Sequence, residues 1–279
     1  LLVRLHTDKD ILENVSDYGS LSIIFSYIIL FNVILSYGLE TSFFRFFNKE
    51  SNKQDVISTA SISIIFTTAI FFAIASIFQV EISLFTGIET QYLELVLWIL
   101  ALDALVVIPF AYLRAKGQAI KYSLIKIINV VVYFSLNIIL LILVKKFAPV
   151  SDIASYIYIP NYEINYIFIS NLIASLVSLI LLIPFYFKIN YRINIDLLKK
   201  MLMYAFPILI SGLAYSINET FDKILLDFML PDSIAKSEIG MYAACYKLAL
   251  FMTLFSTAYK LGIEPFFFKE ANEKSPQKT

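Results

Sequence analysis

Residues 164–187 have the sequence INYIFISNLIASLVSLILLIPFYF, and this stretch decides the fold class. It is 24 residues long and contains no Asp, Glu, Lys or Arg. The hydrocarbon core of a bilayer is about 30 Å thick and is crossed by about 20 mainly apolar residues in a helix. The stretch is much longer than a strand and does not alternate with period 2, so it predicts a transmembrane helix and not a barrel strand.

Further stretches of this kind lie along the chain. One of them carries a single acid, Asp103, and the last two contain several charged residues. They are residues 18–39, 56–80, 95–113, 127–144, 201–230 and 239–268. The sequence therefore predicts seven spans in an all-α, polytopic transmembrane helical bundle. Residues 1–3 would be the tail of an earlier helix, and the chain would then be a fragment of a longer protein.

The composition agrees with a membrane protein and excludes other classes. Charged residues make up only 16% of the 279 residues, whereas soluble domains carry about 25%. The net charge is zero, with 22 basic and 22 acidic residues, which argues against a nucleic-acid-binding protein. Cys245 and His6 are each the single residue of their type, which excludes a disulfide framework and a Cys/His zinc site. We expect no metal and no cofactor.

Basic residues are unevenly distributed between alternate loops. Residues 48–54, 114–126, 188–200 and 269–278 together hold 13 Lys and Arg, whereas residues 4–17, 79–94, 145–163 and 231–236 hold 5. Cytoplasmic loops are enriched in Lys and Arg, so the first set is predicted to be cytoplasmic. The strict alternation also supports seven spans threaded up and down through the membrane.

A motif at the end of the first span recurs at the end of the last. Residues 38–45 are GLETSFFR and residues 262–269 are GIEPFFFK, so that glycine, acid, two phenylalanines and base recur at an offset of 224. Gly19 and Gly240, near the starts of the same two helices, are 221 residues apart. The match predicts a parallel repeat of two six-helix lobes, as many transporters have. The predicted divisions are an N-terminal lobe at 1–188, a basic cytoplasmic connector at 189–200 and the start of a C-terminal lobe at 201–279.

Charged residues within the spans are candidate functional groups, because a charge in hydrocarbon costs roughly 2.5–3.5 kcal/mol on insertion scales. Asp103 lies near the middle of its span, where it would bind a proton, a cation or a polar substrate, or would only help the helices to assemble. Asp222 and Lys223 share one helix face with Glu219 and Asp227. That face would either line an outward-opening cavity or protrude into water as an ion-pair ladder.

Further candidates lie at helix ends and breaks. Glu40 and Glu264 are at cytoplasmic helix ends, where they would act as gates or simply extend to the interface. Pro207 and Gly212 are candidate hinges. A basic cytoplasmic loop would either set the topology or attract anionic lipid headgroups; its residues are Arg114, Lys116, Lys121 and Lys126.

Several short motifs carry a resemblance to a known family. They are DYG at 17–19, YGLETSFFRF at 37–46, FP at 206–207, FDK at 221–223, GMY at 240–242, YKL at 246–248 and GIEPFF at 262–267. In helix order these resemble bacterial polysaccharide flippases of the multidrug/oligosaccharidyl-lipid/polysaccharide exporter superfamily. The motifs are typical of the family and do not specify a substrate.

The resemblance implies a two-lobed transporter of the bacterial cytoplasmic (inner) membrane, with a central cavity that opens alternately to either side. Such proteins move undecaprenyl-diphosphate-linked oligosaccharides for capsule or lipopolysaccharide assembly. Cationic cavity residues would meet the diphosphate, and the candidates by position are Arg4, Arg45, Lys223, Lys247 and Lys260. In this alignment the chain would begin at the end of helix one and stop after helix eight, and alone it would not transport.

Other functions remain open at this point. A drug/cation antiporter of the same superfamily would need a cavity dominated by acids and aromatic rings. A multi-span polysaccharide polymerase or ligase would need a large external loop with an acid/base constellation, and the longest outer segment, residues 145–163, is short. A purely structural scaffold is less compatible with the repeat and the charges inside the spans. The expected partners are a lipid-linked oligosaccharide, membrane lipid and a coupling proton or sodium ion, with no nucleic acid.

Overall fold

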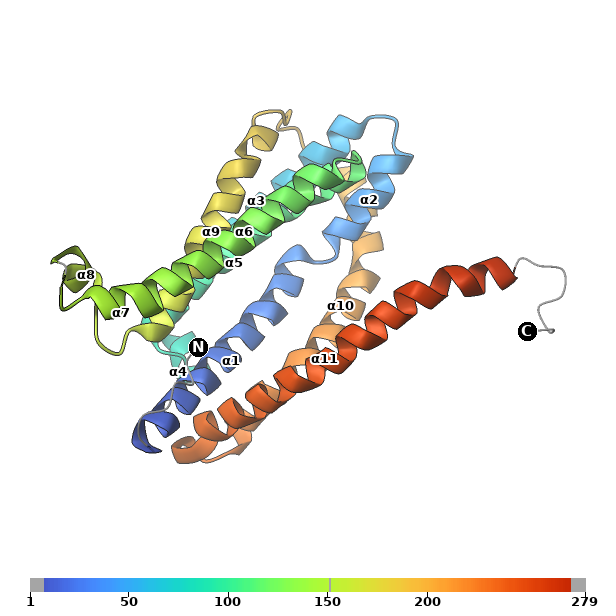
Figure 1. Cartoon of the computed structure of the whole chain (residues 1–279). Coiled ribbons are helices and arrows are strands. Elements are labelled where there is room, and N and C mark those ends of the chain that lie inside the picture. The colour runs from blue at the N-terminus through green and yellow to red at the C-terminus, as the bar shows by residue number, and fades with distance from the viewer. Residues whose placement is uncertain (1–7, 151, 272–279) are drawn as a thin grey trace. The chain divides into compact units, whose positions relative to one another are not determined.

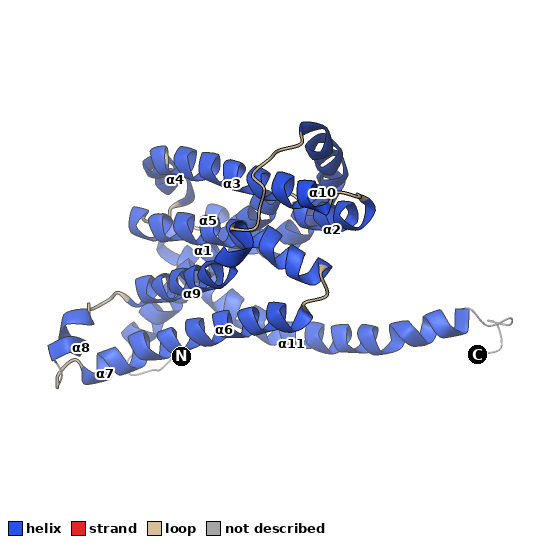
Figure 2. Ribbon diagram, turned by 90° about the horizontal axis from the view of Figure 1, so that it is seen from above, coloured by secondary structure: helices blue, strands red, loops and turns tan. Residues whose placement is uncertain are grey.

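The computed structural model describes residues 8–150 and 152–271; within them, side chains are not described for residues 8–14, 152–154, 250, 251, 254 and 256–271. This part of the chain consists of helices joined by loops and contains no strand (Figure 2). The helices, in chain order, are α1 (Asp8–Ser36), α2 (Leu39–Lys49), α3 (Lys53–Ile77), α4 (Gln79–Thr86), α5 (Thr90–Ala115), α6 (Ala119–Ile138), the π-helical turn η1 (Ile139–Leu143), α7 (Val144–Phe147), α8 (Asp152–Ile157), α9 (Glu163–Tyr186), α10 (Ile195–Met229) and α11 (Asp232–Ala271).

Six of the described helical segments are long and apolar enough to cross a membrane. They are Val15–Lys49, Lys53–Ile77, Thr90–Ala115, Ala119–Phe147, Glu163–Tyr186 and Ile195–Met229. The fold class predicted from the sequence, an all-α polytopic membrane bundle, is therefore confirmed. The seventh predicted span, residues 239–268, lies within α11, where most side chains fall outside the description, and it stays a prediction.

The first predicted span is interrupted, which the hydrophobicity of residues 18–39 did not indicate. Tyr37 and Gly38 adopt positive φ angles of 34° and 69° between α1 and α2 (Figure 1). A Cβ at Gly38 would lie 2.6 Å from the carbonyl oxygen of Ala205 in α10, so glycine is required both by the left-handed backbone and by the close approach. The chain then continues as α2, ten residues past the predicted end.

The connector predicted at residues 189–200 is shorter in the structure. Helix α10 begins at Ile195, because Asn194 accepts a hydrogen bond from the backbone N–H of Leu197 at 3.0 Å. This contact satisfies one of the unpaired donors at a helix start. Residues 195–200, which are half of the predicted connector, therefore belong to α10 and form about its first turn and a half. The predicted lobes themselves stay a prediction.

The described chain divides into two compact units, one of residues 24–224 and one that joins residues up to 23 with those from 225 onwards. The core of the first unit lies where α2, α3, α5 and α10 meet. Phe43 is fully buried there and stacks on Phe47 with ring centroids 5.4 Å apart. Helix α5 packs against both α3 and α9, and α6 packs against α9.

Packing inside the first unit relies on small hydroxylated residues as well as on aromatic rings. Buried residues of α3 include Ser58, Thr59 and Ser61. The Ser42 hydroxyl donates to the backbone oxygen of Met201 at 2.8 Å and joins α2 to α10. Lipid tails are as apolar as leucine, so helices in a membrane associate through such close packing and hydrogen bonds.

Candidate functional site

Asp103 of α5 is held in a polar contact between helices. Its Oδ1 accepts a hydrogen bond from the Ser175 hydroxyl of α9 at 2.7 Å. The Asn32 side chain of α1 is a further hydrogen-bond partner, and Lys126 of α6 is near enough to attract the carboxylate. An acid at mid-span therefore meets groups from three other helices, an arrangement that can hold a proton or a cation as well as tie the helices together.

A second polar contact lies one turn further along α9. The Asn129 side chain of α6 donates to the Ser178 hydroxyl at 2.9 Å, and that hydroxyl donates in turn to the backbone oxygen of Ala174. Ser175 and Ser178 thus connect the same helix to α5 and to α6. Neither serine could be predicted as a site residue from the sequence, because each lies in an apolar stretch that has no distinguishing motif.

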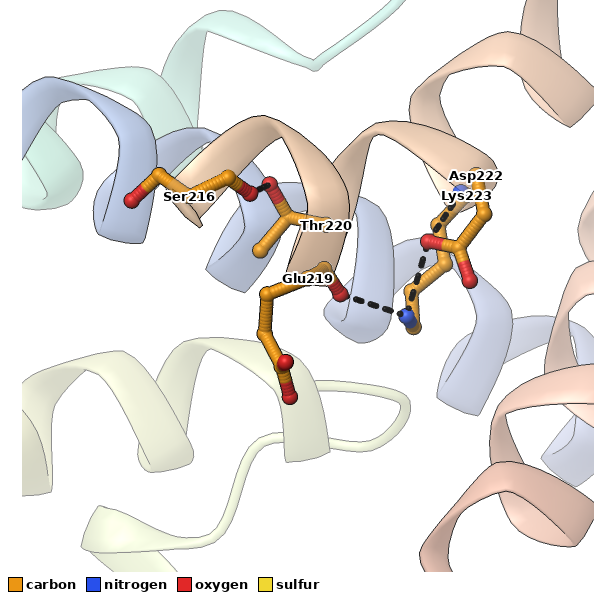
Figure 3. Close-up of polar contacts among 5 residues, drawn as sticks. All are labelled: Ser216, Glu219, Thr220, Asp222 and Lys223. Carbon is orange, nitrogen blue, oxygen red and sulfur yellow. Dashed lines mark hydrogen bonds and ion pairs between the residues drawn. The ribbon is translucent and has the colours of Figure 1, made fainter. Parts of the chain in front are cut away.

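Lys223 of α10 is a buried cation. Only 8% of the residue is exposed, and its Nζ lies 3.0 Å from Oδ1 of Asp222 and 3.5 Å from the backbone oxygen of Glu219 (Figure 3). In the figure the ammonium folds back along its own helix, while the Glu219 side chain points away from it. Lys223 therefore lies inside the packed structure and does not extend into water, and the role predicted for this helix face stays a prediction.

Hydroxyl groups continue the polar side of α10 towards the middle of the span. Ser216 and Thr220 are buried, and the Thr220 hydroxyl donates to the backbone oxygen of Ser216 at 2.8 Å (Figure 3). Thr220 precedes Lys223 by one turn of helix and Ser216 by two. This stretch of α10 can offer one ammonium donor to an anionic ligand, and hydroxyl oxygens that accept hydrogen bonds from a hydroxyl-rich ligand.

An ion pair between Glu40 and Arg114 joins the start of α2 to the end of α5. Glu40 was predicted at a helix end, but it lies in the first turn of α2, and this helix continues to Lys49. The Arg114 guanidinium also lies over the Phe44 ring, 4.9 Å from its centroid. Arg45, which is exposed, lies instead over the Tyr204 ring of α10 at 4.2 Å. Glu40 therefore contacts a base from another helix, a partner that spacing along the sequence could not indicate.

In the second unit, α1 and α11 cross with their backbones in contact. A Cβ at Gly19 would overlap the carbonyl oxygen of Lys236, and a Cβ at Gly240 would overlap that of Val15. These are equivalent contacts, because the offset of 221 that relates Gly19 to Gly240 also relates Val15 to Lys236. The crossing thus has the reciprocal form of a two-fold contact, in which i meets j and j meets i.

Lys247 lies beside this crossing. Its Nζ is 4.7 Å from the centroid of the Tyr18 ring, the residue that precedes Gly19. The side chain is exposed within the described part of the chain, and a cation over an aromatic face retains its charge for a further ligand. Lys247 and Lys223 belong to different units.

The remaining candidates have the following positions. Pro207 is exposed within α10, and Gly212 is partly buried in the same helix, where a Cβ would lie 3.1 Å from the Val33 side chain. Arg4 and the side chains of Lys260 and Glu264 lie outside the described residues. The site roles of all these residues stay predictions.

Comparison with known proteins identifies the family. Residues 14–265 match the family described as polysaccharide biosynthesis protein, which confirms the resemblance carried by the motifs between residues 17 and 267. No curated protein and no solved structure gave a match. Because the match covers far more than half of the 279 residues, this multi-pass helical chain belongs to the polysaccharide biosynthesis protein family.

Proposed function

We propose that this protein is a flippase that moves undecaprenyl-diphosphate-linked oligosaccharide across the bacterial cytoplasmic membrane by alternating access, for capsule or lipopolysaccharide assembly. The observation that carries the proposal is the Lys223 cation, buried at 8% exposure within a candidate membrane span of α10. A charge in such a position is expensive and is retained for a function or a partner. A lipid diphosphate provides the counter-charge that an ammonium binds.

The hydroxyls beside Lys223 support the same proposal. Thr220 and Ser216 lie one and two turns before Lys223 on α10, where they can contact phosphate oxygens or sugar hydroxyls. Transport of this kind moves the substrate without breaking a bond, so the protein needs binding groups in the membrane and no catalytic pair. A polymerase or ligase would need an acid and a base beside a glycosidic bond.

Complementation tests the transport activity directly. The intact gene that encodes this chain, expressed in bacteria lacking their own oligosaccharide flippase, is expected to restore surface glycan and to lower the amount of lipid-linked oligosaccharide held at the inner leaflet. Surface glycan is measured by immunoblot, and leaflet distribution by labelling of the exposed sugar. Resistance to cationic drugs without glycan export would overturn the proposal in favour of an antiporter.

Asp103 is proposed to couple transport to a proton or sodium gradient. Asp103→Asn keeps the size of the side chain and the contact with Ser175 but removes the charge. In proteoliposomes we expect the variant to lose the response of transport to an imposed gradient by about tenfold, equivalent to roughly 1.4 kcal/mol, while exchange without a gradient continues.

The control for Asp103→Asn is Ser178→Ala. This change removes the neighbouring contact between α6 and α9, the 2.9 Å bond to Asn129, and leaves the carboxylate in place. Its gradient response should equal that of the unmodified protein. If Asp103→Asn also responds normally, Asp103 is an assembly residue and the coupling proposal fails.

A further inference from the structure

Helix α6 presents a continuous stripe of large apolar side chains. The stripe residues are spaced i, i+4, i+7, i+11 and i+14, so they follow one side of the helix; they are Ile120, Leu124, Ile127, Val131 and Phe134, and each is at least 55% exposed. Helix α6 packs against α9, and within the described part of the chain it has no fully buried side chain.

Cations lie at the start of this stripe. Residues 114–126 hold four basic residues and no acid; they cover the end of α5, the short turn at 116–118 and the start of α6 (Figure 1). This part of the chain is predicted to be cytoplasmic. Lys116 and Lys121 are both exposed. The Lys116 ammonium lies 4.8 Å from the centroid of the Tyr112 ring. Tyrosines are enriched at the membrane–water interface, so this contact is expected to place the ammonium at the depth of the lipid headgroups.

We infer that the α5–α6 turn and the α6 stripe together form a binding site for an anionic phospholipid of the cytoplasmic leaflet. Lys116 and Lys121 bind the headgroup phosphate, and the acyl chains lie along the stripe that begins at Ile120. The two parts are continuous, because Ile120 and Lys121 are adjacent at the start of α6. The site is separate from the proposed Lys223 site and does not depend on which substrate is carried.

The composition of the stripe favours lipid over another helix or a soluble anion. Interfaces between membrane helices are rich in Gly, Ala, Ser and Thr, which let backbones approach closely, as Gly19 and Gly240 do here. The α6 stripe consists instead of Ile, Leu, Val and Phe. These side chains suit flexible acyl chains, and a soluble phosphate would gain nothing from them. Basic residues near an anionic leaflet each contribute about fivefold in binding.

Native mass spectrometry of the intact protein can test the site. The protein would be released from nanodiscs made with phosphatidylglycerol or with phosphatidylcholine, and bound lipids would be counted. We expect retained phosphatidylglycerol and little phosphatidylcholine. The double variant Lys116→Gln/Lys121→Gln should bind phosphatidylglycerol about twenty-fivefold more weakly, from about fivefold for each lysine, whereas Lys116→Arg/Lys121→Arg should bind it normally.

A matched control removes the same charge elsewhere. Lys199 and Lys200 are exposed near the start of α10, on the same predicted side of the membrane, and Lys199→Gln/Lys200→Gln should leave the retained phosphatidylglycerol unchanged. A second test shortens the stripe with Ile120→Ala/Leu124→Ala, which should also lower lipid retention.

Three results would overturn the inference. The first is equal loss of lipid in Lys116→Gln/Lys121→Gln and in Lys199→Gln/Lys200→Gln, which would mean a general charge effect. The second is retention unaffected by Lys116→Gln/Lys121→Gln. The third is displacement of the lipid by millimolar inorganic diphosphate with no effect of the stripe variant, which would show a site for soluble anions.

Discussion

Replacing Lys223 by glutamine is expected to reduce glycan export by about tenfold to a hundredfold in the complementation assay. The variant removes an ammonium that is 8% exposed, and a hydrogen bond to a charged group contributes about 1.5–3 kcal/mol. The Asp222 carboxylate, 3.0 Å away, would then lie beside a neutral amide and would repel an incoming phosphate. The loss should therefore appear as weaker substrate binding as well as slower export.

A structural role for Lys223 would give a different result. Removing one partner of a buried ion pair lowers stability, so the Tm of the purified variant must be measured beside export. Lys223→Arg retains the charge and should recover most of the export, while Asp222→Asn leaves the cation in place and should tighten phosphate binding. If Lys223→Gln exports normally at unchanged expression, the diphosphate site proposed on α10 is wrong.

Adding a methyl group at the crossing of α1 and α11 is expected to be the most destabilising small change in the described chain. Gly240→Ala would place a Cβ against the backbone carbonyl of Val15, and Gly19→Ala against that of Lys236. Neither carbonyl can rotate away as a side chain can. We expect each variant to lose about 3 kcal/mol, the upper part of the usual range for overpacking, seen as a clearly lower Tm of the purified protein.

The losses of stability in the two single variants should not be additive. Once the first methyl group has separated the helices, the second enters space that is already open, so Gly19→Ala/Gly240→Ala should be little worse than either single variant. Gly212→Ala is the matched control, because its Cβ would meet only the Val33 side chain, at 3.1 Å. A Tm for Gly240→Ala equal to that of Gly212→Ala would contradict the crossing as described.

The sequence predicted the positions of the helices well because hydrophobicity is a property of single residues, summed over about 20 of them. The stretch at 164–187 became α9 (Glu163–Tyr186) with nearly the predicted ends. The interruption at Tyr37 and Gly38 was missed because it involves a contact between residues far apart in the sequence. Gly38 lies close to the backbone of Ala205, a residue more than 160 positions away, and a glycine within an apolar run carries no local sign of that contact.

The sequence predicted the charged residues of the candidate site but not the residues that they contact. Asp103 and Lys223 stand out because charges are rare in membrane spans. Their partners do not, since serine and asparagine are common in such helices, and which serine meets Asp103 depends on the rotation of α9 about its axis. The ion pair of Glu40 with Arg114 was missed likewise. The repeat predicted from the sequence paired Gly19 with Gly240 as equivalent positions, but it did not indicate that the helices cross there in contact.

The crossing at Gly19 and Gly240 has a mechanical consequence. Contacts between side chains can adapt, because rotamers change and one neighbour replaces another as helices slide. Here the Cα of each glycine lies against a carbonyl of the opposite backbone, and neither group has a rotamer to change. Such a contact cannot be partly made. When α1 moves relative to α11, this backbone contact therefore either stays closed, so that the helices turn about it, or separates completely.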